Sequence, residues 1–333
     1  MRLGRALAVT AIVVVLPGAV LAQSYNDGFE PPYREGFPLS GQNNWFLPLP
    51  AGSTPWFVYS YANNPLGITA NPNGGTQMAG AIKDTVGLFP RAQRDFDFSQ
   101  RTRWLVGYDV YVSYSGQPGM NANNIGSFSL QPATAPTRYF IDLFQWVTPS
   151  GEVPGNPDDG WRAGWVVTNA AGSDTFLVTF TPPNPFHGLQ INRWYRRYVA
   201  FDLENGVLVK VGIRDLTTGQ LAATRVGPTE SFPYWYLVNY NNPSRQNPTA
   251  FRLFVGGGTG EATGNILAVD NILITGFNEG DVDLDGCVNN ADLLQVLFDF
   301  GQQGPFRPAD LNSDGSVNNA DLLLVLFNFG QGC

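Results

Sequence analysis

The sequence predicts a mainly β chain, in which a two-sheet antiparallel β-sandwich is followed by a small, duplicated α-helical module. The first observation is a period-two alternation of apolar and polar residues in many segments, which is typical of strands. The second is the abundance of turn-forming residues, with 38 Gly and 25 Pro in 333 residues. The third is a unit that occurs twice within residues 280–333, where Asp281 recurs as Asp310.

Residues 1–22 have the pattern of a secretory signal peptide. Basic residues precede an apolar run over residues 6–20, and small residues follow, with the expected cut between Ala22 and Gln23. The run is shorter than the ~20 residues that a transmembrane helix needs, and no later stretch is long and apolar enough to span a membrane. We therefore expect the protein to be secreted or at the cell surface, with an uncleaved anchor as the alternative.

Residues 23–276 are expected to form the β-sandwich. Along Thr102–Tyr114 the even positions are apolar, whereas the odd positions include Arg103 and Asp109. In residues 207–214 four β-branched residues alternate with others that include Lys210, which predicts a second such strand. Further strands are expected at Gln77–Lys83, Ile125–Gln131, Arg138–Val147, Trp161–Thr168, Asp174–Phe180, Trp194–Leu203, Leu221–Val226, Phe251–Val255 and Ile266–Ile274.

Two segments of this domain resemble the concanavalin A-like jelly roll of lectins and glucanases. They are the opening Asp27-Gly28-Phe29-Glu30 and the closing pair Phe251–Gly258 and Gly264–Ile272. The resemblance implies that the last strand pairs with the first, which would bring Asn271 near Phe29. Sandwiches of this kind often hold a structural calcium ion, and the resemblance makes Asp270 a candidate ligand.

The sequence gives the sandwich no recognisable catalytic site. Glycosidases need two facing carboxylates, and jelly-roll glucanases carry them as ExDxxE, which has no match here. Asp95 and Asp97 are the closest pair on one strand face, and a polar edge with Phe96 and Phe98 pointing inward explains them better. We assign no catalytic residue.

Carbohydrate binding is the expected role of the sandwich, because exposed aromatic rings stack on the CH faces of sugars. For each candidate ring, packing in the core is the alternative. With 18 acidic and 16 basic residues in its body, the domain has no excess of positive charge for nucleic acid. The candidates are Trp146, Trp161, Trp165 and Trp235.

The repeat in residues 277–333 has the ligand spacing of a calcium-binding loop. Oxygen-bearing side chains occupy loop positions 1, 3, 5, 9 and 12, position 6 is Gly286 or Gly315, and position 7 offers a backbone carbonyl. The region carries nine acidic residues and one base, so a bound cation would relieve strong repulsion. Two Ca²⁺ ions are therefore expected, with ligands Asp281, Asp283, Asp285, Cys287, Asn289 and Asp292, and Asp310, Asn312, Asp314, Ser316, Asn318 and Asp321.

Only the exit helices of these EF-hand-like units are predicted, at Ala291–Phe300 and Ala320–Phe329, because Gly and Pro precede each loop. Duplicated loop-and-exit-helix units resemble the dockerin module. This resemblance implies a cohesin-like protein or a cell-surface anchor as partner. It also assigns partner choice to positions 10 and 11, which are identical in the two copies and so allow two orientations. These are Asn290, Ala291, Asn319 and Ala320, while Leu293, Leu294, Leu297, Phe298, Leu322, Leu323, Leu326 and Phe327 are expected to form the small core and part of the docking face.

The two cysteines, Cys287 and Cys333, both lie in this module. In an oxidising compartment a disulfide between them would join the first loop to the last residue. A Cys at position 7 with a terminal Gly-Cys resembles the GC-type dockerin, and Cys333 as a covalent attachment point is the alternative.

We therefore expect an exported, non-catalytic protein with a carbohydrate-binding or surface-displayed sandwich, attached through a calcium-dependent module. The alternatives are a polysaccharide-degrading glycoside hydrolase or lyase, and a structural envelope protein.

Overall fold

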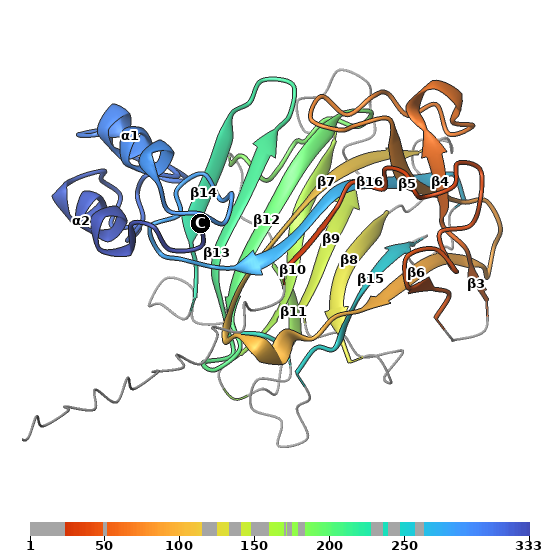
Figure 1. Cartoon of the computed structure of the whole chain (residues 1–333), viewed down its shortest axis with the longest axis horizontal. Helices are drawn as coiled ribbons and strands as arrows, with labels where there is room; N and C mark the ends of the chain where they lie inside the picture. Colours follow the sequence, from red (N-terminus) through yellow and green to blue (C-terminus); the bar gives the residue numbers. More distant parts are fainter. Residues whose placement is uncertain are drawn as a thin grey trace, which may run out of the picture.

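The computed structural model of the chain describes residues 24–48, 52–114, 125–132, 141–147, 160–169, 171, 175–178, 184–227, 236–238, 247–256 and 263–333. The expected cleavage site at Ala22 and Gln23 and the candidate ring of Trp235 lie outside these ranges. Within them the chain is mainly β, with two α-helices near its C-terminus, so the predicted fold class is confirmed (Figure 1).

Two eight-stranded sheets form the sandwich. The strands pair antiparallel except for a short parallel bridge between β3 and β6. The first sheet has the order β14-β13-β12-β7-β16-β5-β4, and β1 also pairs with β16. Its strands are β14 (Leu221–Arg225), β13 (Val207–Asp215), β12 (Trp194–Asp202), β7 (Arg103–Tyr114), β16 (Asn265–Gly276), β5 (Gln77–Lys83), β4 (Phe57–Ser60) and β1 (Tyr25–Asp27).

The second sheet has the order β11-β10-β9-β8-β15-β6-β2, with β3 beside β6. Most of its strands coincide with the predicted ones. The strand β6 was not predicted, because Pro90 lies within it and its apolar residues do not alternate. The members are β11 (Thr175–Val178), β10 (Trp161–Thr168), β9 (Ile141–Val147), β8 (Gly126–Gln131), β15 (Ala250–Val255), β6 (Phe89–Asp95), β2 (Trp45–Phe46) and β3 (Ser53–Thr54).

The main core lies between the two sheets and is rich in aromatic side chains. On β7 the even positions from Trp104 to Val112 point into it, as the alternation predicts. From the second sheet, Phe128 and Phe251 stack with ring centroids 5.6 Å apart. The first and last strands pair as expected, with Asp27 opposite Ile272, and the Asn271 side chain lies close to Gly28.

The outer face of the first sheet is also buried, which the alternation did not predict. Tyr111 and Trp194 lie in one cluster with Ile68 and Met78, next to Leu66 and Tyr61 from the loop after β4. A second cluster joins Leu105, Tyr198 and Val209 of the sheet to Phe277 and Leu284 of the C-terminal region. A register shift between Ala200 and Phe201 places Val209 in this outer cluster, while Leu208 faces the core.

The C-terminal module lies beside the β13–β14 end of the sandwich (Figure 1). Its helices are α1 (Asn290–Asp299) and α2 (Asn319–Asn328), each within one residue of the prediction. Gly301 and Gly330 follow them in the left-handed conformation, with φ values of 80° and 82°. The module has its own small core of seven buried residues: Val282, Val288, Val296, Ala309, Leu311, Val317 and Val325.

Candidate metal centre and the apolar face of the helices

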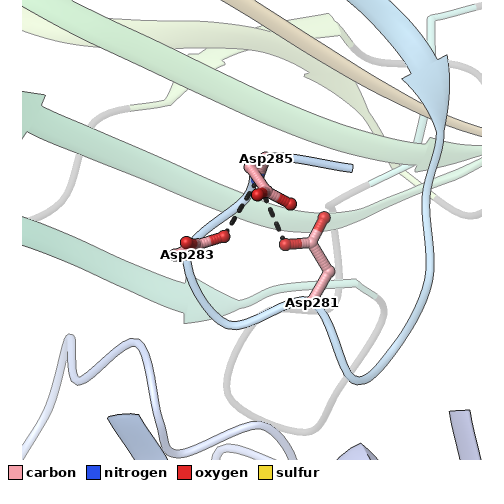
Figure 2. A group of neighbouring side chains, drawn as sticks. All are labelled: Asp281, Asp283 and Asp285. Carbon is pink, nitrogen blue, oxygen red and sulfur yellow. Dashed lines mark hydrogen bonds between the residues drawn. The ribbon is translucent and has the colours of Figure 1, made fainter. Parts of the chain in front are cut away.

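The first loop brings three carboxylates together. One oxygen from each of Asp281, Asp283 and Asp285 lies within 4.8 Å of the other two (Figure 2). The backbone N–H of Asp285 donates to Oδ1 of Asp281 and to Oδ1 of Asp283, both at 3.2 Å. Gly286, with φ of 96°, turns the chain so that its N–H donates to Asp281 Oδ2 at 2.9 Å. These carboxylates converge because the backbone wraps around them.

The second loop repeats this hydrogen bonding position by position. Asp314 N–H donates to Asp310 Oδ1 at 3.1 Å and to Asn312 Oδ1 at 3.0 Å, and Gly315 N–H donates to Asp310 Oδ2 at 2.9 Å. Position 4 is left-handed in both loops, with φ of 62° at Leu284 and 57° at Ser313. The two copies therefore share one backbone conformation.

The side chains at positions 9 and 12 hold each loop against its helix. The side chain of Asn289 caps α1 by accepting from Ala291 N–H, and Asp292 accepts from Asn289 N–H with Oδ2 and from Val282 N–H with Oδ1. The same bonds in the second loop come from the side chains of Asn318 and Asp321. Because the oxygen of position 9 caps the helix, ligation there would fit the water-mediated contact common at this position.

The donor set of the first loop fits a hard cation such as calcium, since all of its side-chain donors at positions 1, 3, 5 and 12 are carboxylate oxygens. Burial, together with the neighbouring carboxylates, raises the pKa of Asp283 to about 6. Burial likewise raises the pKa of Asp281 to about 7, and Lys210 opposes that rise. A divalent cation among these oxygens would offset both the desolvation and the repulsion.

The end of each helix pairs with the loop of the other copy. Gly330 N–H donates to Val288 O at 2.8 Å, and Val288 N–H donates to Gln331 O at 2.9 Å. In the equivalent place, Gly301 and Gln302 pair with Val317. A disulfide joins Cys287 at position 7 of the first loop to Cys333, and position 7 of the second loop is Ser316.

Both helices expose the same apolar side chains. Phe298 is 79% exposed and its counterpart Phe327 is 78% exposed. The expectation that the large helix residues form the small core was therefore wrong for most of them. Five valines, Ala309 and Leu311 fill that core, and of the eight expected residues only Leu293 and Leu322 pack partly against it. The exposed set, called here the apolar helix face, is Leu294, Leu297, Phe298, Phe300, Leu323, Leu326, Phe327 and Phe329.

The residues expected to set partner choice lie beside this face. Asn290, Ala291, Asn319 and Ala320 are all exposed in the first turns of α1 and α2. Their side chains and the apolar helix face together form a surface that the repeat duplicates.

Two of the four candidate sugar-binding rings need correction. Trp161 and Trp165 are fully buried between the sheets, where Trp161 packs edge-on against Tyr195 and Trp165 against Phe186. Their rings have no exposed face on which a sugar could stack. Trp146 lies in β9 in register with Arg162, and its side chain is outside the described part of the chain.

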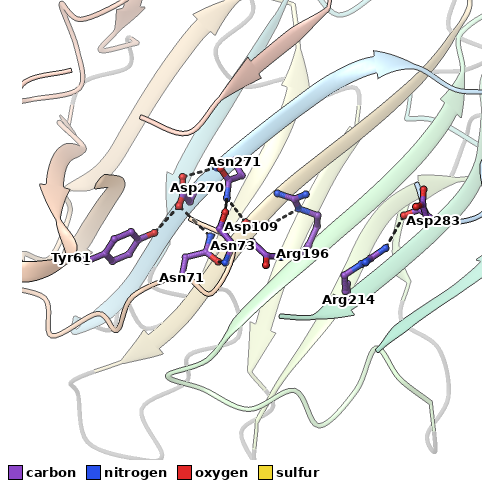
Figure 3. Close-up of polar contacts among 9 residues, drawn as sticks. All are labelled: Tyr61, Asn71, Asn73, Asp109, Arg196, Arg214, Asp270, Asn271 and Asp283. Atoms are coloured by element: carbon purple, nitrogen blue, oxygen red, sulfur yellow. Dashed lines mark hydrogen bonds and ion pairs between the residues drawn. The ribbon is translucent and has the colours of Figure 1, made fainter. Parts of the chain in front are cut away.

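Two of the carboxylates considered in the sandwich, Asp97 and Asp270, have structural partners. Asp97 caps the 3₁₀-helix Phe98–Gln100 by accepting from Ser99 N–H at 2.9 Å. Phe96 and Phe98 are buried, as expected for an outer polar edge. Asp270 accepts hydrogen bonds from Tyr61 Oη, Asn71 Nδ2 and Asn271 N–H (Figure 3). A calcium ion at Asp270 stays a prediction.

A polar row on the second sheet was not predicted. Gln93 of β6, Arg252 of β15 and Ser129 of β8 are cross-strand neighbours, and Asp142 of β9 follows in register. Arg252 donates to Gln93 Oε1 through Nε, at 2.9 Å, and through Nη2. Gln93 Nε2 is buried, with no hydrogen-bond partner in the described residues. Because Phe251 and Leu253 flank Arg252 and face the core, this row lies on the opposite face of the sheet.

Neither described helix has the length and apolarity that a membrane span requires. No family model matches the sequence, and no curated protein matches it. Among solved structures, the chain is similar to a cellulose-induced protein, with 11% identity and a TM-score of 0.45 over 75% of this chain and 96% of that one.

Two further similar structures are those of a lectin and a lyase. One is the basic lectin of winged bean with Tn-antigen, with 10% identity and a TM-score of 0.39 over 76% of this chain and 97% of that one. The other is an alginate lyase from Pseudomonas aeruginosa, with 10% identity and a TM-score of 0.34 over 71% and 87%. All three TM-scores are below 0.5.

Proposed function

We propose that the chain is an exported, non-catalytic protein whose C-terminal module binds two Ca²⁺ ions and attaches it to a cohesin-like protein or a cell-surface anchor. The observation that carries this proposal is the apolar helix face, which is repeated on α1 and α2 with almost equal exposure at Phe298 and Phe327. Exposed apolar patches of this kind mark protein interaction sites. The pattern of residues 1–22 supports export.

Calcium supports this docking role because it would fix the loops from which the helices begin. In the first loop, Asp292 accepts from the backbone of the loop start and also caps α1. A Ca²⁺ ion bound in the first loop would therefore help to set the direction in which α1 leaves the loop. Without the ion, repulsion among the carboxylates opposes this arrangement.

Calorimetric titration of the full mature chain with Ca²⁺ tests the metal, and we expect two ions per chain. Purified cohesin domains from several families, titrated with and without chelator, test the partner. Binding should require Ca²⁺. Because the face is duplicated, Phe298→Asp or Phe327→Asp alone should leave one usable orientation, whereas the double variant should lose binding. Asp84→Asn, on an exposed residue of the sandwich, is the control.

For the sandwich we propose polysaccharide binding on the face of the second sheet that carries the polar row of Gln93, Arg252 and Ser129. These three side chains are at most 5% exposed, so a sugar would have to displace what covers them. A buried amide donor with no protein partner is costly, and a sugar hydroxyl is a suitable acceptor for it. The guanidinium of Arg252 is oriented by its two bonds to Gln93. This preorganisation lowers the cost of binding a polar ligand.

A glycan array that includes neutral and uronate-containing polysaccharides tests the second part. The Gln93→Leu variant should lose binding, and Gln220→Leu, on the exposed turn between β13 and β14, should not. Cleavage of the bound polysaccharide would favour the hydrolase or lyase alternative. Absence of glycan binding together with intact docking would favour a structural envelope protein.

A further inference from the structure

The two loops have the same backbone but different surroundings. Leu284, at position 4 of the first loop, is buried in a cluster with Leu105, Tyr198 and Val209 of the first sheet. Ser313, at the same position of the second loop, is exposed and accepts from Arg225 N–H at the sheet edge. The repeat therefore departs from its own symmetry where the first loop meets the sandwich.

Two cations of the sandwich donate to the backbone of the first loop. Arg214 Nη2 lies 2.9 Å from Asp283 O, and Lys210 Nζ lies 3.3 Å from Asp281 O (Figure 3 shows the Arg214 contact). Lys210 is only 4% exposed, and β13 holds it under the loop. These bonds turn the two carbonyls outward, while the Asp281 and Asp283 side chains point into the loop.

The other described cations on this face have acidic partners within the sheet or the linker. Arg103 pairs with Asp202 and Glu279, and Arg225 also pairs with Glu279. Farther along the sheet, Arg196 pairs with Asp109 and Arg193 with Asp215. Among the described residues, Lys210 and Arg214 form no ion pair, so the first loop is the nearby source of balancing charge.

With all four carboxylates of the loop ionised, a divalent cation balances the charges. These carboxylates, Asp281, Asp283, Asp285 and Asp292, exceed the charge of Lys210 and Arg214 by two. One Ca²⁺ removes this excess. Burial of a cluster with no net charge is much less costly than burial of one with two uncompensated charges.

We infer that Lys210 and Arg214 of the sandwich form part of the surroundings of the first calcium site. Ca²⁺ in this loop then stabilises the contact of the module with the outer face of the first sheet. The inference rests on the proposed calcium binding but adds a coupling between Ca²⁺ binding and the contact of the module with the sandwich. Linkage makes this coupling reciprocal, so contact with the sandwich also raises the affinity of the first loop for Ca²⁺. The second loop lacks such contacts with sandwich cations in the described residues. Its affinity for Ca²⁺ therefore does not depend on the contact between the module and the sandwich.

The chain offers a specific probe of the contact between the module and the sandwich, because Lys83 and Lys210 are its only lysines and both are buried. The full mature chain is treated with an amine-acetylating reagent, and each lysine is followed by mass spectrometry. We expect Lys210 to react roughly tenfold or more faster in chelator than in Ca²⁺, within the usual range of coupling between sites. Lys83, inside the sandwich, should stay protected in both.

Two variants remove the contact from opposite sides. A Cβ on Gly212 would lie 2.9 Å from Leu284 Cδ1, so the Gly212→Val side chain should displace the first loop from the sheet without changing a calcium ligand. Leu284→Ser gives the first loop the residue of the second, and Val86→Ser, on an exposed turn of the sandwich, is its control. In the first two variants Lys210 should react in Ca²⁺ as well, and calorimetry should show one weakened site and one unchanged site.

The outcomes separate the coupling from the metal. No calcium binding at all would remove the proposed function and this inference together. Two bound ions with Lys210 equally protected in chelator would overturn the coupling and leave the calcium module standing. If Lys83 also becomes reactive in chelator, calcium stabilises the whole sandwich rather than its contact with the module, and the inferred coupling is wrong.

Discussion

Asp109 and Asp270 face each other across β7 and β16 with both carboxylates fully buried. Asn71 Nδ2 bridges them, 2.7 Å from Asp109 Oδ2 and 3.2 Å from Asp270 Oδ2. Arg196 Nε donates to Asp109 Oδ1 at 2.5 Å (Figure 3). Among the described acids, the guanidinium of Arg196 pairs with Asp109 alone, and burial raises the pKa of Asp270 to about 7.

This pair predicts a pH dependence of stability. Because the pKa of Asp270 is higher in the folded than in the unfolded chain, its contribution is fully present below about pH 4 and is lost as pH rises to about 7. Asp270→Asn cannot titrate, so the free energy of unfolding of the wild type should fall relative to this variant across that window. Denaturant unfolding of both proteins at several pH values, in constant Ca²⁺, measures the difference. Glu204→Gln, on an exposed acid, should run parallel to the wild type, and parallel curves for Asp270→Asn would contradict the prediction.

The glycines at position 6 should differ in their tolerance of alanine. Both have positive φ, so alanine costs about 1–2 kcal/mol of strain in either loop. A Cβ on Gly315 would meet nothing within 4 Å, whereas one on Gly286 would lie 2.7 Å from Thr275 Cγ2. We therefore expect Gly286→Ala to lose more unfolding free energy than Gly315→Ala. Equal losses would mean that the first loop is not held against β16.

Truncation to alanine should lower the unfolding free energy in the module core but hardly change it on the apolar helix face. Val296 is fully buried in the module core, so Val296→Ala should cost about 2 kcal/mol of unfolding free energy. Leu297 is its exposed neighbour, and Leu297→Ala should change stability by less than about 0.5 kcal/mol. Chemical unfolding followed by the helical signal measures both. A large loss at Leu297 would show that the apolar helix face is buried in the free protein.

The disulfide should stabilise the end of the module. Cys287 and Cys333 are 46 residues apart, and a closed loop of that length is worth about 4 kcal/mol in the chain-entropy model. Cys333→Ser should therefore lower the unfolding free energy of the module and release Gly330 and Gln331 from Val288. Hydrogen exchange at the Val288 amide reports this release. Unchanged exchange and stability would instead favour Cys333 as an attachment point.

Local patterns in the sequence were enough to predict the strands and the two exit helices. Strand β7 begins within one residue of its prediction, because the alternation that predicts it is contained within a few residues. The left-handed glycines at position 6 of the two loops follow from spacing in the same way. In contrast, β6 has Pro90 and no alternation, so only its neighbours β15 and β2 reveal it as a strand.

The candidate sites were less predictable, because exposure depends on what covers a residue. The patterns that placed Trp161 and Trp165 on one strand face could not show that this face is the core. The patterns that made the helices apolar could not show that valines fill the module core and leave Phe298 and Phe327 exposed. Likewise, nothing local marks Gln93 as the neighbour of Arg252, which is 159 residues away.

By itself the sequence determined the period of each strand, the spacing of the loop oxygens and the limits of the helices, because these depend on residues close together in the chain. Only the tertiary structure decided that Lys210 lies beneath the first loop and that Leu284 is buried where Ser313 is exposed. The physical reason is that burial and charge balance are properties of the assembled surfaces. Two loops with one local pattern therefore become different sites once the sandwich covers one of them.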